Sequence, residues 1–100
     1  LPMRTEIVIL DSIKKAEDSD AVVVRLYEPH GKRGRAKFFA MFPVKSVWRC
    51  NLLEHEEEQL EWNYEKGMNE KESSDDDVWG GTTFEATPFQ IITLKLELDI

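Results

Sequence analysis

The sequence of 100 residues lacks long apolar runs and contains a single cysteine. Its longest uninterrupted apolar runs have four or five residues, whereas a helix that crosses a bilayer needs about 20. One thiol, Cys50, cannot close a disulfide within the chain, so a disulfide scaffold is excluded and a reducing compartment is favoured. The first residues, Leu-Pro-Met, lack the basic and apolar segments of a signal peptide. We therefore expect a soluble piece of a longer protein.

Helical periodicity is also absent. No window of about a dozen residues places apolar side chains at helical spacing, whereas alternation by two recurs along the chain. Hydrophobic residues make up 41% and aromatic residues 10% of the sequence, which suits one globular domain over residues 1–100. A chain of this size buries roughly 60 to 65% of its unfolded surface and is only marginally stable alone. These features predict a single all-β domain that gains stability from another surface.

Seven short strands are predicted from this alternation. In the clearest one, residues 89–98, Ile92 and Leu94 alternate with polar neighbours, so one face packs on a core and the other mostly faces water. Residues 4–11 are apolar on both sides, which predicts a central or sandwiched strand, and residues 13–20 form a polar connection. The other predicted strands are residues 22–27, 36–42, 46–53, 59–64 and 82–86. Short strands separated by turn signals are typical of an antiparallel β-sandwich, with a closed barrel as the alternative.

The net charge of −7 is concentrated in one segment. Residues 54–77 contain eleven acids and two lysines, a net charge of −9, which leaves +2 for the rest of the chain. Within this segment and just after it, residues 66–81 combine charge, serine and glycine with few apolar groups, so burial cannot offset the entropy of ordering them. We predict that residues 66–81 form a long, acidic, disordered insertion in a hairpin loop.

Four cations follow Gly31 within six residues and raise the question of an anion site. They are Lys32, Arg33, Arg35 and Lys37. No Lys-Ser/Thr pair opens a helix there, so the spacing matches no phosphate loop. Glycine and solvated cations are ordinary at the tip of a β-hairpin, and the acidic segment would repel a nucleic acid backbone. The pattern therefore favours a hairpin turn, and nucleic acid is not expected as a partner.

Metal-binding and catalytic patterns are missing from the chain. His30, His55 and Cys50 show no spacing typical of a structural zinc site. Asp75 to Asp77 lack the alternate oxygens and the glycine of a calcium loop. Acids on a mobile loop cannot be held at the fixed separation that catalysis by a pair of carboxylates demands. We therefore predict no metal, no cofactor and no catalytic residue in this chain.

The three tryptophans offer a different kind of site. Trp48 and Trp62 lie within apolar alternation, so core packing is the favoured interpretation for both. Trp79 precedes Gly80-Gly81 and is the candidate for an exposed ring on which a sugar could stack. A stand-alone carbohydrate-binding or protein-binding module is accordingly the alternative function.

Three short motifs occur in a fixed order along residues 22–98. They are Arg25-Leu26-Tyr27-Glu28 before Gly31, Leu52-Leu53-Glu54, and Pro88-Phe89-Gln90 at the start of the last strand. In this order and spacing they resemble the C-terminal β-sandwich of glycoside hydrolase family 38 α-mannosidases, of the cytosolic and vacuolar type. The chain departs from that family at residues 66–81, where its insertion is longer than the usual hairpin.

The resemblance implies that the chemistry lies outside this chain. Members of the family hydrolyse α-mannosidic bonds in oligosaccharides with retention, using an aspartate nucleophile, a second acid and a zinc ion in an N-terminal domain. None of those residues can be placed on this sequence. The implied partners are the remaining domains of the same enzyme and its oligosaccharide substrate, with a homo-oligomeric parent left open and no membrane partner. The implied compartment is the cytoplasm, with the vacuole or lysosome as the alternative.

Apolar residues on the second side of the strands predict a docking surface. A small free-standing domain rarely exposes a large apolar patch, so we expect this side to be covered by the rest of the enzyme. Arg25 and Glu28 are expected to pair or to bond backbone groups across the surface. The predicted docking residues are Val23, Arg25, Tyr27, Glu28, Phe39 and Met41.

Overall fold

The computed structural model of the chain describes residues 3–16, 19–65 and 79–99, which form nine strands and no helix. None of these described residues belongs to a helix that could cross a membrane. The strands are β1 (Met3–Glu6), β2 (Ile9–Lys15), β3 (Val22–Tyr27), β4 (Gly34–Ala40), β5 (Val44–Cys50), β6 (Glu56–Leu60), β7 (Asn63–Glu65), β8 (Trp79–Ala86) and β9 (Ile91–Leu98). The prediction of an all-β protein is confirmed.

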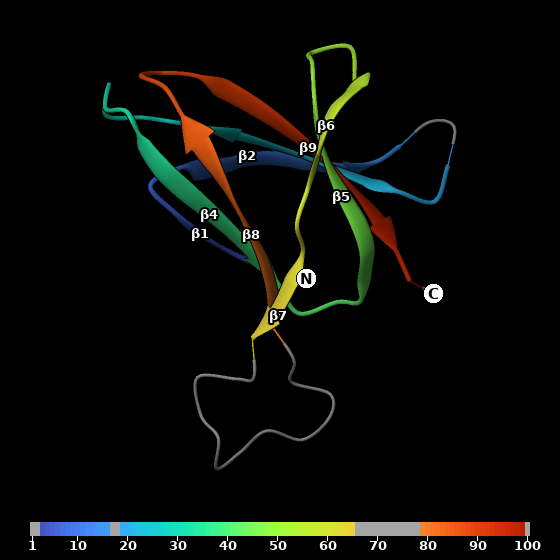
Figure 1. Cartoon of the computed structure of the whole chain (residues 1–100). Coiled ribbons are helices and arrows are strands. Elements are labelled where there is room, and N and C mark those ends of the chain that lie inside the picture. The colour runs from blue at the N-terminus through green and yellow to red at the C-terminus, as the bar shows by residue number, and fades with distance from the viewer. Residues whose placement is uncertain (1–2, 17–18, 66–78, 100) are drawn as a thin grey trace.

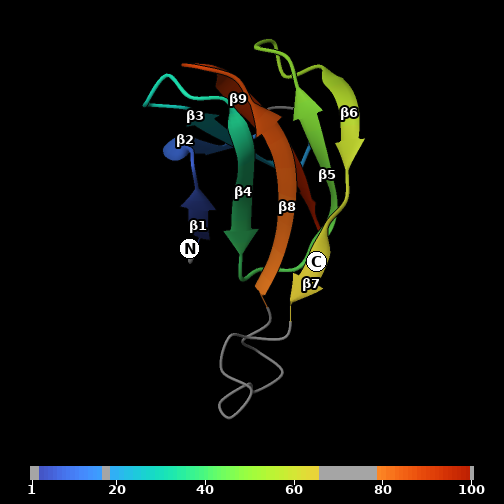
Figure 2. The same cartoon turned by 60° about the vertical axis from the view of Figure 1, so that its left-hand side comes forward.

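Two antiparallel sheets pack face to face, as Figures 1 and 2 show from two sides. The four-stranded sheet has the order β1-β4-β8-β7, and the five-stranded sheet has the order β2-β3-β9-β5-β6. Consecutive strands often belong to different sheets, so several connections cross from one layer to the other. This arrangement confirms the predicted β-sandwich over the alternative of a closed barrel.

The core lies between the two sheets and is built from alternate residues of each central strand. Ile92, Leu94 and Leu96 of β9 are fully buried, as the alternation of the last strand predicts. From the opposite sheet Phe38 meets them, and the Trp62 ring packs on Phe38 with 6.3 Å between ring centroids. Each such side chain contributes on the order of 2 kcal/mol of hydrophobic stabilisation when it leaves water.

The prediction of one strand, central or sandwiched, over residues 4–11 is wrong. The segment divides into β1 and β2, which lie at the edges of different sheets. The chain turns between them at Ile7, which has a positive φ of 75°, and Val8 points into the core. Residues 13–15, expected in a polar connection, continue β2. Apolar residues occur on both sides of this segment because the chain changes sheets.

A change from one sheet to the other also divides the strand predicted over residues 59–64. β6 pairs with β5 in one sheet, and β7 pairs with β8 in the other. Trp62 lies at the crossing, and its ring packs against the core. These two divisions turn the seven predicted strands into nine.

The cationic segment between β3 and β4 is not a hairpin turn, because β3 pairs with β2 and β9 whereas β4 pairs with β1 and β8. The segment crosses from the five-stranded sheet to the four-stranded one. Arg35 pairs with Glu85 on the neighbouring strand at 3.2 Å. The cations therefore belong to a crossing between the sheets and to the exposed side of β4.

The predicted acidic insertion falls largely outside the described residues, which stop at residue 65 and resume at residue 79. On its two sides β7 and β8 pair antiparallel, with Glu65 opposite Trp79. The prediction of a disordered loop therefore lies outside the described residues, except at residues 79–81, which belong to β8.

Candidate functional site

A buried carboxylate fixes the turns at one end of the sandwich. Glu28, directly after β3, is 1% exposed. Its Oε2 accepts a hydrogen bond from the backbone N–H of His30 at 2.9 Å. Its Oε1 accepts from the N–H groups of Lys32 at 3.0 Å and Phe89 at 3.1 Å. One side chain thus ties the β3–β4 crossing to the β8–β9 turn.

The sequence around Glu28 suits this geometry. Gly31 has a φ of 71°, and a Cβ at this position would lie 2.7 Å from Cζ of Phe89. Only glycine combines that backbone conformation with such a close ring. In the opposite turn, Gln90 Oε1 accepts hydrogen bonds from both the N–H and the hydroxyl of Thr87 at 2.9 and 3.0 Å. The Pro88-Phe89-Gln90 motif therefore closes a fixed turn.

The hydrogen bonds keep Glu28 ionised. Burial raises the pKa of the Glu28 carboxyl, whereas the backbone N–H groups of Phe89, His30, Lys32 and Gly31 lower it. The net pKa is below the ordinary value of 4.5, because hydrogen bonds to the charged form favour it. A carboxylate held in this way is a structural anchor and is poorly suited to donate or accept protons in catalysis.

A second contact joins the other family motifs on the outer face of the five-stranded sheet. Arg25 Nη2 donates to the carbonyl of Leu52 at 3.3 Å and lies 3.9 Å from Glu54 Oε2. The same Glu54 oxygen is 2.7 Å from Lys14 Nζ. The Arg25 strand and the Leu-Leu-Glu turn are therefore fixed to one another, just as Glu28 is fixed to Phe89.

The turn between β5 and β6 is preorganised by Asn51. The side-chain oxygen of Asn51 accepts hydrogen bonds from the N–H groups of Leu53 at 2.9 Å and His55 at 3.1 Å. The adjacent leucines, Leu52 and Leu53, are 61% and 75% exposed. We call this pair the leucine turn. A rigid turn that displays two leucines to water is typical of a contact surface.

Exposed apolar residues also gather in a row across three strands near Glu28. Ile9, Tyr27 and Ile91 stand opposite one another on β2, β3 and β9. Next to this row lie Pro29 and Phe89, the latter 69% exposed. We call Ile9, Tyr27, Pro29, Phe89 and Ile91 the end patch. The leucine turn and the end patch lie at the same end of the sandwich (Figures 1 and 2).

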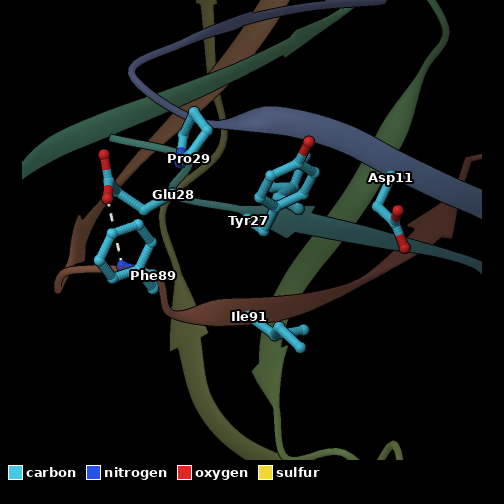
Figure 3. Close-up of a pocket in the computed structure, with 7 residues that line it drawn as sticks. Asp11, Tyr27, Glu28, Pro29, Phe89 and Ile91 are labelled. Carbon is cyan, nitrogen blue, oxygen red and sulfur yellow. Dashed lines mark hydrogen bonds between the residues drawn. The ribbon is translucent and has the colours of Figure 1, made fainter. Parts of the chain in front are cut away.

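A pocket of about 370 Å³ opens within the end patch. Figure 3 shows Tyr27, Pro29, Phe89 and Ile91 around it, with Asp11 on the opposite side of Tyr27 from Phe89. The full lining is Asp11, Leu26, Tyr27, Glu28, Pro29, Phe89 and Ile91. The lining side chains are apolar apart from the Tyr27 hydroxyl and two carboxylates, of which Glu28 is bound by backbone N–H groups.

The six predicted docking residues do not form one surface. Odd-numbered residues of β3, including Val23 and Arg25, face outward from the five-stranded sheet, whereas Phe39 faces outward from the four-stranded sheet. Val23 is 1% exposed and Phe39 is 6% exposed, so neither is available to a partner in this fold. Met41 is half-buried. The sequence indicates that these strands are apolar on both sides. It does not indicate that their outer sides lie on opposite faces of the molecule.

Three of those six residues take part in the structure described above. Tyr27 is the centre of the end patch, and Arg25 and Glu28 do bond backbone groups as expected. The bonds of both residues, however, stay within the domain. Sequence reasoning missed Asp11, Ile9 and Ile91, because they come together only through strand pairing. Ile9 and Ile91 could have been found only by knowing that β2 and β9 flank β3.

Core packing was predicted for two tryptophans, and the structure confirms it for one of them. Trp62 packs against the core, as expected. Trp48 is half-buried outside the core, opposite Lys95 on β9, so its predicted core position is wrong. Trp79 is half-buried, and the Arg4 guanidinium lies over its ring at 5.8 Å. One face of Trp79 is thus occupied, and sugar stacking on the other face stays a prediction.

Cys50 is one of the residues considered above as a metal ligand. Cys50 is buried beside β6, and burial first, then the Glu56 carboxylate, raises the pKa of its thiol. Such a thiol stays protonated and packs as a small hydrophobe. Among the described residues, no three His, Cys, Asp or Glu side chains are grouped as metal ligands. The zinc ion implied by the family resemblance belongs to the catalytic domain of the parent enzyme, outside this chain, and stays a prediction.

The fold and its anchored turns define a small antiparallel β-sandwich domain. Residues 8–94 match the model of the family described as "Glycosyl hydrolases family 38 C-terminal beta sandwich domain". The chain belongs to this family.

A characterised relative agrees with this assignment. Over 52 residues the chain is 44% identical to "Alpha-mannosidase G" of Dictyostelium discoideum. The match covers 49% of this chain and 5% of the relative. The chain thus corresponds to a small part of the length of that relative.

Proposed function

We propose that this chain is a non-catalytic domain that supports the catalytic part of an α-mannosidase by docking on it. The whole enzyme would hydrolyse α-mannosidic bonds in oligosaccharides. Membership of the family and the similarity to an α-mannosidase support the parent enzyme. The family resemblance further suggests a zinc ion in the catalytic domain and a cytoplasmic or vacuolar parent enzyme, and both stay predictions.

The end patch is the observation that carries the docking proposal. Ile9, Phe89 and Ile91 are 45%, 69% and 58% exposed although they are large and apolar. They are held by strand pairing and by the Glu28 hydrogen bonds, so the patch cannot fold away to hide them. Contiguous apolar surface of this kind marks a contact with another protein surface, and a rigid one binds at low entropic cost.

The described carboxylates give no support to catalysis in this domain. Glu28 is the one fully buried acid among them, and backbone N–H groups occupy both of its oxygens. Glu54 and Glu56 are engaged by Lys14 and Lys95 at 2.7 and 3.3 Å. Retaining hydrolysis needs two free carboxyl groups across a sugar pocket. A supporting role therefore suits these residues better than a chemical one.

The docking proposal is tested by placing a charge in the end patch of the full-length enzyme. Ile91→Asp is expected to lower the thermal midpoint by several degrees and to speed loss of mannosidase activity on heating, because a buried unpaired charge opposes docking. Ile13→Asp is the matched control, since Ile13 is also exposed but lies along β2 away from the patch. Equal midpoints and equal inactivation rates for both variants would remove the proposal.

A further inference from the structure

The pocket in the end patch carries a carboxylate that the fold does not use. Among the described residues, no hydrogen bond or ion pair joins the Asp11 side chain to another group, and Asp11 is exposed. The nearby cation Arg25 is directed to the Leu52 carbonyl and to Glu54. Asp11 is therefore available to a cation from outside the domain.

A β-bulge aims Asp11 at the pocket. The register of β2 on β3 shifts between Leu10, which is opposite Leu26, and Ser12, which is opposite Arg25. Asp11 is the extra residue between these pairs. A bulge redirects a side chain relative to the regular alternation of a strand. As a result Asp11 lines the same pocket as Tyr27 and Ile91 (Figure 3).

The remaining walls suit the aliphatic part of a long basic side chain. Tyr27, Pro29, Phe89 and Ile91 surround the opening, and aliphatic stems of arginine and lysine pack on such surfaces while their heads seek an anion. The aromatic rings also attract a cation that lies over them. At about 370 Å³ the pocket is near the small end of ligand sites, which fits one side chain.

We infer that this pocket receives a basic side chain, an arginine in preference to a lysine, from another segment of the same enzyme polypeptide. Arginine is preferred because its planar head both stacks on aromatic rings and pairs with a carboxylate through two N–H groups. We assign the basic side chain to the same polypeptide because the proposed parent enzyme is far longer than this chain: the matched residues are 5% of the α-mannosidase relative. This inference rests on the proposed docking. It adds that a basic side chain, bound in the pocket beside Asp11, anchors the docked surface.

The test uses the full-length enzyme with Asp11→Asn and Asp11→Arg, and Asp99→Asn as the control carboxylate at the other end of β9. Hydrogen exchange of the segment 87–92 is measured. We expect exchange on the order of tenfold faster in Asp11→Arg than in the unmodified enzyme, since undocking exposes this turn. The acceleration should shrink at about 1 M salt, where charges are screened.

Two outcomes separate this inference from the docking proposal. If Asp11 variants exchange like Asp99→Asn while Ile91→Asp still accelerates exchange, docking holds and the basic anchor is wrong. If none of the variants changes exchange, both the docking proposal and the basic anchor fail.

A cryo-EM map of the unmodified enzyme provides the second measurement. An arginine or lysine head beside Asp11 supports the inference, whereas an empty pocket, an apolar side chain or a second copy of the chain in the pocket overturns it.

Discussion

At the scale of single residues, Glu28 explains why two distant motifs occur together. Its carboxylate is buried, and it binds N–H groups from the β3–β4 crossing and from Phe89, 61 positions along the chain. The need for a buried bond to the backbone was predictable from a polar residue at the end of an apolar strand. The partner at Phe89 was not, because the sequence contains no sign that these two turns meet.

Replacing Glu28 by glutamine tests this anchor. An amide offers one acceptor oxygen and turns an N–H₂ group toward donors, so buried N–H groups lose partners. We expect Glu28→Gln to lower the thermal midpoint of the chain by more than about 4 °C. Glu85→Gln, at the exposed ion pair with Arg35, is the matched control and should change the midpoint little. A Glu28→Gln midpoint equal to that of the control would refute the anchor.

The pKa of Glu28 gives a prediction about pH. Its folded pKa lies below the ordinary value of 4.5, so its stabilisation is complete above the unfolded pKa and is lost as pH falls through the folded one. Stability should therefore decline as pH drops below about 4.5. Glu28→Gln should lack that part of the decline, as measured by denaturant titrations at successive pH values. Parallel pH curves for the two proteins would contradict the assignment.

At the scale of elements, β8 is shaped by glycines that admit large rings. Phe39 on β4 stands opposite Gly81, and a Cβ there would lie 2.6 Å from Cδ1 of Phe39. The Arg4 guanidinium also lies over this ring, 4.9 Å from its centroid. Glycines in a strand interior are otherwise unfavourable. The Gly-Gly step is therefore a packing feature of the four-stranded sheet.

Alanine substitutions in the strands test this packing. We expect Gly81→Ala to destabilise the chain by about 1–3 kcal/mol, because the Phe39 ring must move. Gly34→Ala is the control, since its Cβ would meet Ile7 at an ordinary 3.5 Å. Urea unfolding measures both. An equal free energy of unfolding for the two variants would show that the Phe39 ring shifts without cost.

Strand prediction succeeded where alternation was uninterrupted and failed where the chain changes sheets. β9 alternates through Ile92, Leu94 and Leu96 without a break, and its buried face was predictable. The switches at Ile7 and Trp62 carry no glycine or proline, so the alternation gave no boundary there. The bulge at Asp11 could not be predicted either, because one extra residue in a strand is recognised only from its register with the partner strand.

At the scale of the whole molecule, the sandwich has one end that suits a partner. The end patch and the leucine turn lie there together, beside a pocket that holds an unpaired carboxylate. The family was predicted from the order and spacing of three motifs, which the structure joins pairwise, Arg25 with Leu52 and Glu28 with Phe89. The residues of the proposed docking face could not be predicted, because they come from separate strands whose order only the fold determines.

Hydroxyl-radical footprinting of the full-length enzyme tests the docking claim most directly. Phe89 is 69% exposed in the β8–β9 turn, and Tyr64 is 54% exposed on β7. Docking through the end patch predicts that Phe89, together with Ile91, is protected from labelling in the enzyme, whereas Tyr64 is oxidised readily. Strong labelling of Phe89 and Ile91, at rates that match their exposure in the chain, would contradict the account.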